Sequence, residues 1–172
     1  MFHAPTIATQ LGTTDADGSS VFAWSASERA ALDLWSDLLR VTGTVRGLLA
    51  ERLDTELGMV PEEVDLLMRL EEAPEQRLRM ADVSRSLQLS KSGVTRLVDR
   101  LAERGLVERA ACPSDRRVVY AGLTAEGRRA VAEAAPLLVA GVVGHLADQL
   151  KARELDALQS SLRKIIAAEG TA

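Results

Sequence analysis

The stretch Ser90–Gly105, SKSGVTRLVDRLAERG, has the marks of a short amphipathic helix with a defined start and end. Ser90 is a favourable N-cap because its hydroxyl accepts a hydrogen bond from a backbone N–H that has no partner inside the helix. Leu89 and Val94 occupy the two positions of a hydrophobic staple. Gly105 stands at the C′ position, where a left-handed backbone is favoured. The sequence therefore predicts one helix over this stretch.

The two faces of this predicted helix differ in chemistry. One face is apolar, with side chains spaced at i, i+3, i+4 and i+7: Val94, Leu97, Val98 and Leu101. The other face carries small hydroxyls beside basic groups: Lys91, Ser92, Thr95, Arg96 and Asp99. Hydroxyl and basic side chains near a helix N-terminus reach base edges and phosphates in DNA-binding helices. Taken alone, however, such a face is equally consistent with an ordinary solvated surface.

The flanking sequence favours the first interpretation. Met80–Gln88 predicts a second short helix, and only a few residues separate it from Ser90, as in angled helix-turn-helix pairs. After Gly105, residues 107–109 and 118–123 are predicted strands, joined by the turn-prone Pro113, Ser114 and Asp115. The predicted fold is therefore mainly α with a small β-hairpin wing, a winged helix-turn-helix.

The charge distribution agrees with a nucleic-acid-binding module. The whole chain has a net charge of −4, which argues against a protein that coats nucleic acid over its entire surface. Residues 79–124 contain nine Arg or Lys and five Asp or Glu, a net +4, so the remainder carries −8. A basic module in an acidic protein is the pattern expected of a localised phosphate-binding surface.

The wing residues carry a family resemblance. Asp115-Arg-Arg117-Val-Val-Tyr-Ala-Gly-Leu123-Thr124 resembles the D-x-R-x-x-x-x-x-L-T wing signature of the MarR family of bacterial transcription regulators. The Cys112–Asp115 lead-in and the Arg104–Arg109 run are also typical of that family, and the resemblance extends over about residues 32–168. It implies an obligate homodimer of winged helix-turn-helix subunits. Members usually repress nearby genes and release DNA when a small phenolic or anionic molecule binds, and others respond to oxidation.

The resemblance also implies roles for individual residues. Ser90–Arg100 would lie in the major groove of double-stranded DNA, and Arg117, braced by Asp115, would reach the minor groove. The candidate DNA-binding residues are Ser90, Lys91, Ser92, Thr95, Arg96, Arg100, Asp115, Arg116 and Arg117.

The remaining sequence predicts helices on both sides of this module. With 172 residues, one domain is expected. We expect a flexible tail over residues 1–26 and a single domain over 27–172, with the winged module at about 60–124 and dimerisation helices at 27–57 and 125–168. Ser25 and Glu28 match a capping box that opens the first helix, Pro61 opens the next, and Thr124 caps a helix that we expect to bend at Pro136.

These flanking helices have wide apolar faces that one small subunit would struggle to cover. We therefore expect an intertwined homodimer, in which Gly141 and Gly144 permit close helix contact. A dimer would place two recognition helices about 34 Å apart and would bind an inverted-repeat operator.

The position of an effector site is a weaker inference. In this family, small molecules usually bind between the dimer helices and the DNA-reading lobe. The residues that could line such a site are Trp35, Arg40, Met59, Asp65 and Met68. For Trp35 and Met68 the alternative of plain core residues is favoured, because apolar residues at helical spacing usually belong to the core. If Asp65 is buried, it requires an arginine or a ligand donor as its partner.

The sequence also excludes several classes of protein. It has no targeting signal and no uninterrupted apolar run of transmembrane length, and its single cysteine cannot form an intrachain disulfide, so we expect a cytoplasmic protein without membrane contact. No metal-ligand spacing, cofactor motif or catalytic constellation is present, so we expect no metal, no cofactor and no enzyme activity. Two alternatives remain open: a winged-helix module that contacts proteins without binding DNA, and an oxidation sensor using Cys112.

Overall fold

The computed structural model describes residues 24–111, 115 and 118–169. The chain divides into two units, the first ending at Gly43 and the second beginning at Thr44. The described part of the first unit is the N-terminal portion of helix α1 (Ala26–Leu57), which continues into the second unit.

The predicted capping box opens α1. The Glu28 backbone N–H donates to Ser25 Oγ at 3.2 Å, and Glu28 Oε2 accepts from Ser25 N at 2.8 Å and from Ser25 Oγ at 2.7 Å. These hydrogen bonds, that of the Ser25 side chain first, lower the pKa of Glu28 below its ordinary value because they stabilise the charged carboxylate. The start of α1 is thus confirmed as the sequence predicted it.

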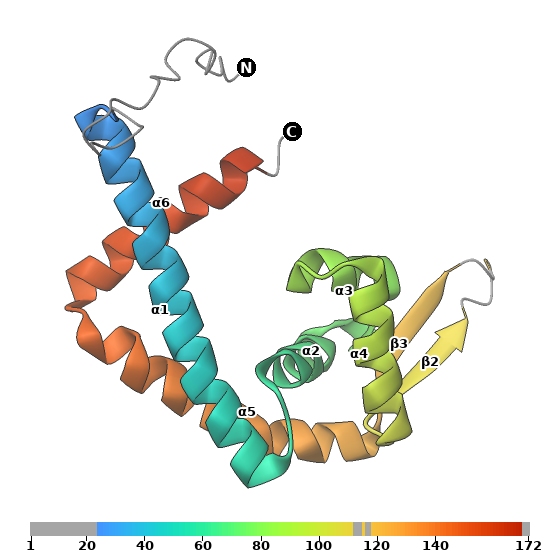
Figure 1. The fold of residues 1–172 in the computed structure, drawn as a ribbon. Helices are drawn as coiled ribbons and strands as arrows, with labels where there is room; N and C mark the ends of the chain where they lie inside the picture. Colours follow the sequence, from blue (N-terminus) through green and yellow to red (C-terminus); the bar gives the residue numbers. More distant parts are fainter. Residues whose placement is uncertain (1–23, 112–114, 116–117, 170–172) are drawn as a thin grey trace, which may run out of the picture. The chain divides into compact units, whose positions relative to one another are not determined.

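The second unit contains every other helix and strand that the structure describes. In chain order these are α2 (Pro61–Glu72), η1 (Pro74–Gln76), β1 (Arg77–Arg79), α3 (Met80–Leu87), α4 (Lys91–Glu103), β2 (Val107–Ala111), β3 (Val119–Leu123), α5 (Ala125–His145), η2 (Ala147–Gln149) and α6 (Ala152–Glu169). The mainly α fold with a hairpin wing is confirmed. In Figure 1, α3 and α4 lie next to each other and the β2–β3 hairpin extends beyond them.

The sheet has one strand more than the sequence predicted. Its order is β1-β3-β2 and both pairings are antiparallel, with Leu78 opposite Ala121 and Arg109 opposite Ala121 from the other side. The strand β1 was not predicted, because its three residues contain a single apolar side chain, Leu78, and so show no alternation of apolar and polar residues.

The core of the second unit lies among α2, α3, α4, the sheet and the start of α5. The apolar stripe of α4 is buried as predicted, and Val94, Leu97, Val98 and Leu101 are each at most 2% exposed. They pack in one cluster with α2 residues such as Leu66 and Leu70. Because one side of α4 is sealed in this way, its opposite side must face outward.

Both ends of α4 are set by the residues that the sequence singled out. Ser90 Oγ accepts from Gly93 N at 3.1 Å, which is the predicted N-cap bond. At the other end Gly105 has φ +71°, and Leu106 N donates to Leu101 O at 2.9 Å. That bond closes the last turn of the helix in the Schellman manner, so α4 stops where β2 must begin.

Helix α5 runs through Pro136 as one element. Gly141 lets it approach α1 closely, since a Cβ at this position would lie 2.3 Å from Leu49 Cδ2. Gly144 has no neighbour within 4 Å of such a Cβ among the described residues; the contact at Gly141 is within one chain, and the contact between two copies expected at both glycines stays a prediction. The stretch Ala125–Gln149 is long and apolar enough to cross a membrane by length and composition alone, although charged residues such as Glu133 interrupt its apolar run. Since α5 packs along α2 and contributes Val131 and Ala134 to the core, we interpret it as a helix of the folded unit.

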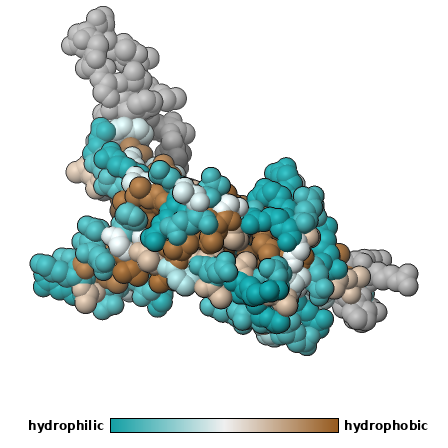
Figure 2. Space-filling model, turned by 90° about the horizontal axis from the view of Figure 1, so that it is seen from below, coloured by the Kyte–Doolittle hydropathy of each residue, from teal (hydrophilic) through white to brown (hydrophobic). Residues whose placement is uncertain are grey.

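Many large apolar side chains are open to solvent in the single chain, and Figure 2 shows such surface among hydrophilic residues. In the second unit they lie mainly on α5 and α6: Val139, Val142, Val143, Leu158, Ile165 and Ile166. In the first unit they include Leu32, Leu34, Trp35, Leu39 and Val41. This is the feature from which the sequence predicted a second copy.

Candidate nucleic-acid interface

The N-terminal half of α4 presents its polar face to solvent. Lys91, Ser92, Thr95 and Arg96 are all exposed, and Ser90 Oγ lies 3.1 Å from Ser92 Oγ. Within the described part of the chain, neither Lys91 nor Arg96 forms an ion pair. The cationic side chains of Lys91 and Arg96 and the hydroxyls of Ser92 and Thr95 are therefore exposed at the start of α4, while the Ser90 hydroxyl caps the helix.

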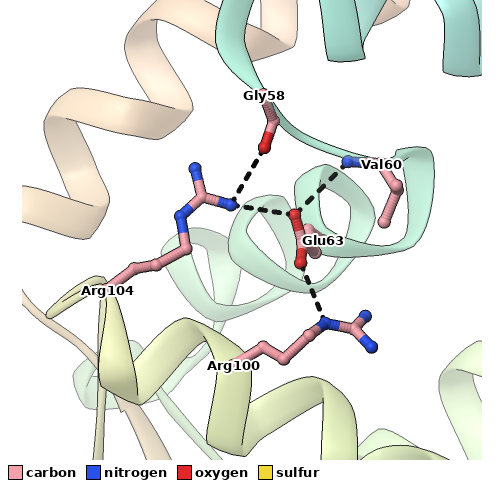
Figure 3. Close-up of polar contacts among 5 residues, drawn as sticks. All are labelled: Gly58, Val60, Glu63, Arg100 and Arg104. Atoms are coloured by element: carbon pink, nitrogen blue, oxygen red, sulfur yellow. Dashed lines mark hydrogen bonds and ion pairs between the residues drawn. The ribbon is translucent and has the colours of Figure 1, made fainter.

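Arg100, also predicted to contact DNA, lies in a different environment. Its Nε is 3.3 Å from Glu63 Oε1, and Arg104, one turn later, places Nη1 3.1 Å from Glu63 Oε2 (Figure 3). Arg104 Nη1 also donates to the Gly58 carbonyl at 3.3 Å. The polar side of α4 thus has an unpaired N-terminal half and a C-terminal half that is paired with α2.

Glu63 was not singled out from the sequence. Its side chain is 6% exposed, and besides the two arginines it accepts from Val60 N at 3.3 Å. The available signal was local: Glu63 is at N3 of a helix that begins at Pro61, a position where a glutamate returns to bond the N-cap backbone. Its partners on α4 could not be found this way, because they lie 37 and 41 residues further along the chain.

The wing strand β2 is tied to α4 by Arg109. Its Nη2 lies 3.0 Å from Asp99 Oδ1 and donates to the Thr95 carbonyl at 3.4 Å. Asp115 is exposed, and its carbonyl accepts from Val118 N at 2.9 Å. The predicted DNA-contact residues Arg116 and Arg117, and the candidate redox residue Cys112, lie outside the described residues.

A cavity of about 450 Å³ lies between the N-terminal ends of α3 and α4 and the strands of the wing. Its lining combines apolar side chains with basic and hydroxyl groups, among them Met80, Lys91, Thr95, Arg109 and Val119. None of the five residues that the sequence suggested for an effector belongs to this lining.

Those five residues lie in several environments. Trp35 and Arg40 are in the first unit and exposed, so Trp35, at 59% exposure, is not a core residue of the single chain. Met59 is a core residue and Met68 packs half-buried against the core, as the alternative interpretation of Met68 expected. Asp65 is half-buried and has the arginine partner it would require, since Arg69 Nε and Nη2 donate to its two oxygens at 2.9 and 3.2 Å.

No cluster of three or more His, Cys, Asp or Glu side chains suited to a metal occurs among the residues described. The exposed donors and cations on the outward face of α4 offer positional and electrostatic recognition.

Comparison with known proteins agrees with this geometry. A family model described as the MarR family matches residues 57–118. Sco3205 from Streptomyces coelicolor, a MarR family transcriptional regulator solved in complex with DNA, is 30% identical over 87% of this chain and 94% of its own, with a TM-score of 0.77. AbsC from the same organism, also a MarR family transcriptional regulator, is 28% identical over 88% and 99%, with a TM-score of 0.78.

A third solved structure, CouR from Rhodococcus jostii RHA1 bound to p-coumaroyl-CoA, is 29% identical over 77% of this chain and 91% of its own, with a TM-score of 0.69. No curated protein matches the chain. The wing signature, the helix-turn-helix geometry and the match to Sco3205 over nearly its whole length lead to one conclusion: the chain belongs to the MarR family of transcriptional regulators.

Proposed function

We propose that this protein is a sequence-specific regulator of transcription that binds double-stranded DNA by inserting α4 into the major groove. The observation that carries the proposal is the outward face of α4, where Lys91, Thr95 and Arg96 are exposed while the opposite stripe is sealed in the core. Arginine and lysine pair with guanine edges, and hydroxyls bond bases or phosphates. The solved complex of the related Sco3205 with DNA supports the same use of the fold.

The second groove contact comes from the wing. We assign Arg117 to the minor groove, with Asp115 bracing it and Arg116 beside it, on the strength of the family signature. The tie between Arg109 and Asp99 supports this assignment, because it fixes the base of the wing to the helix that reads the major groove. A helix and a wing held in register can contact adjacent grooves at the same time.

The functional form is a homodimer on an inverted-repeat operator. The apolar side chains of α1, α5 and α6 that remain exposed in one chain would be covered by the second copy. Two copies of α4 would then lie about 34 Å apart, one turn of DNA.

Regulation by a small molecule is the remaining part of the proposal: a repressor that leaves DNA when a phenolic or anionic effector binds. The relative CouR bound to p-coumaroyl-CoA supports it. The cavity of about 450 Å³ has a volume in the range of small-molecule sites, and Lys91 and Thr95 belong both to its lining and to the outward face of α4. A ligand in this cavity would therefore compete directly with DNA. The effector site expected from the sequence is a different one, with the residues Trp35, Arg40, Met59, Asp65 and Met68.

We further infer that residues 27–172 act as one domain in the cytoplasm. The extent of the structural match supports this, because AbsC aligns over 88% of the chain. Of the tail expected over residues 1–26, residues 1–23 lie outside the described residues, whereas Ser25 and Ala26 belong to the capped start of α1.

A gel-shift titration tests the proposal. Purified protein is mixed with duplex DNA from the region upstream of its own gene, at several salt concentrations. We expect a discrete complex whose affinity falls steeply and log-linearly with salt, because phosphate contacts release counterions. A protein that binds no duplex at low salt would instead be a winged-helix module for protein contacts.

A further inference from the structure

Glu63 is the one buried charged residue among those that the structure describes, at 5% exposure. A carboxylate removed from water is stable only when its oxygens are paired. Here both oxygens are paired, Oε1 with Arg100 and Oε2 with Arg104 and the Val60 N–H (Figure 3). Arg100 belongs to α4 and Arg104 is the C-cap residue that follows it, so the buried carboxylate lies in α2 and its two cationic partners lie in and at the end of the DNA-facing helix.

The two arginines are spaced one helical turn apart. Side chains at i and i+4 lie on the same face, so a single carboxylate can bind both only when that face of α4 is turned toward α2. Two contacts one turn apart fix the rotation of α4 about its axis and its position along that axis. The buried stripe decides which side of α4 faces outward, but the hydrophobic effect is non-directional, so these directional polar contacts define the orientation further.

The contact between Glu63 and Arg104 is also connected to α1. Arg104 Nη1 bonds the carbonyl of Gly58, the residue with φ +60° that ends α1. Glu62, next to Glu63 in the first turn of α2, pairs with Arg46 of α1. The acidic pair at the start of α2 therefore contacts α1 on one side and α4 on the other.

We propose that Glu63 is a positioning residue that sets the orientation of α4 for base recognition. We call its ion pairs with Arg100 and Arg104 the Glu63 anchor, and we propose that Arg100 belongs to this anchor rather than contacting DNA. The inference rests on the proposed DNA-binding function. Contacts to base edges require side chains to be held within about 0.5 Å of the productive geometry. Contacts to phosphates carry no sequence information and tolerate small rotations. Loss of the anchor therefore lowers specific binding and leaves non-specific binding intact.

The test uses two duplexes and a matched pair of variants. The first duplex is selected from a random-sequence pool by the unmodified full-length protein, and the second is a scrambled sequence of the same length and composition. Glu63→Gln removes the charge while keeping the shape. Glu72→Gln removes the same charge from an exposed position on the same helix, so it controls for the weaker repulsion of DNA. Arg104→Gln removes one partner of Glu63 at a side chain that is more exposed than Glu63 itself. It serves as a second variant in case Glu63→Gln fails to fold.

We expect Glu63→Gln to lower the ratio of selected to scrambled affinity on the order of 10-fold. Its affinity for the scrambled duplex and the salt dependence of that binding should stay unchanged. Arg104→Gln should lower the ratio similarly, and the double variant by less than the product of the two, because both act on one contact. Glu72→Gln should leave the ratio unchanged.

An unchanged ratio in both Glu63→Gln and Arg104→Gln overturns the inference, as does an equal decrease in Glu72→Gln. If the unmodified protein enriches no duplex at all, the proposed function fails and the inference falls with it. If the unmodified protein does enrich a duplex and the ratio of selected to scrambled affinity is unchanged in both Glu63→Gln and Arg104→Gln, the positioning role alone is refuted.

Discussion

Gly127 lies directly against the Leu106 carbonyl, and a Cβ at this position would stand 2.1 Å from that oxygen. Thr124, three residues earlier, caps α5 by accepting from Gly127 N at 2.9 Å and donates its hydroxyl to the Gly105 carbonyl at 2.7 Å. The end of the family signature, Leu123-Thr124, thus joins the start of α5 to the turn that ends α4. The signature has a structural role here besides the one expected of its arginines.

This relationship predicts that Gly127→Ala destabilises the protein severely. The obstacle is a backbone carbonyl, which cannot rotate away, so the expected loss is at the upper end of overpacking penalties, about 3 kcal/mol. Urea unfolding followed by circular dichroism measures it. A loss below about 1 kcal/mol, within the range of tolerated core changes, would show that the turn after α4 yields easily.

Gly141→Ala and Gly144→Ala form a matched pair on α5. At Gly141 the new methyl would meet Leu49 Cδ2, a side-chain end that can change rotamer, whereas at Gly144 nothing lies within 4 Å. Alanine in a helix is favoured over glycine by about 1 kcal/mol. We expect Gly144→Ala to be neutral or stabilising and Gly141→Ala to be less stable than Gly144→Ala, by urea unfolding. Equal stabilities would mean that the two helices are not in contact at Gly141.

How much of this could be predicted from sequence is clearest on α4. Ser90, Gly105 and the stripe from Val94 to Leu101 are local signals, and the structure confirms all of them. Other features depend on residues far along the chain. The strand β1 exists because β3 offers it a pairing edge, and Glu63 is satisfied by arginines 37 and 41 residues away.

Trp35 illustrates a different limit. A tryptophan at helical spacing with apolar neighbours indicates that its side chain is buried, but it does not indicate which part of the protein or which partner covers it. In the single chain Trp35 is exposed. Whether such a residue belongs to a core, an interface or a ligand site depends on a partner that periodicity cannot identify. The same ambiguity left the effector residues as predictions.

The pKa of Glu28 predicts a pH dependence at the start of α1. Its folded value is lowered by the hydrogen bonds from Ser25. The capping box therefore stabilises the helix above the ordinary glutamate pKa, and this contribution is lost as the pH falls through the lowered folded value. An NMR titration of the Glu28 carboxyl should give a pKa below that of a free glutamate, and Ser25→Ala should raise it part of the way back, because the backbone N–H of residue 25 still donates to Glu28 Oε2. An identical titration in the two proteins would contradict the capping geometry.

The apolar face of α6 predicts a dimer that one charge disrupts. Ile166 is 67% exposed in the single chain, and Ile166→Glu would bury an unpaired carboxylate if a second copy covers that face. We expect this variant to sediment as a monomer at concentrations where the unmodified protein is a dimer. Ala157→Glu adds the same charge to the opposite side of the helix and should remain dimeric. Two dimeric variants would place the interface elsewhere.

Arg96→Ala tests the reading face of α4 itself. Arg96 is exposed and lacks an ion-pair partner among the described residues, so its removal should leave the fold intact and cost about 1–3 kcal/mol of specific binding if it reads a guanine. Arg129→Ala is the control, because Arg129 is an exposed arginine that pairs with Glu126 on α5. The measurement is the affinity of each variant for the selected duplex across salt concentrations. If Arg96 contacts a phosphate instead, the loss would be uniform across sequences and the salt slope would fall by about one. Binding by Arg96→Ala that equals that of Arg129→Ala would remove this arginine from the DNA interface.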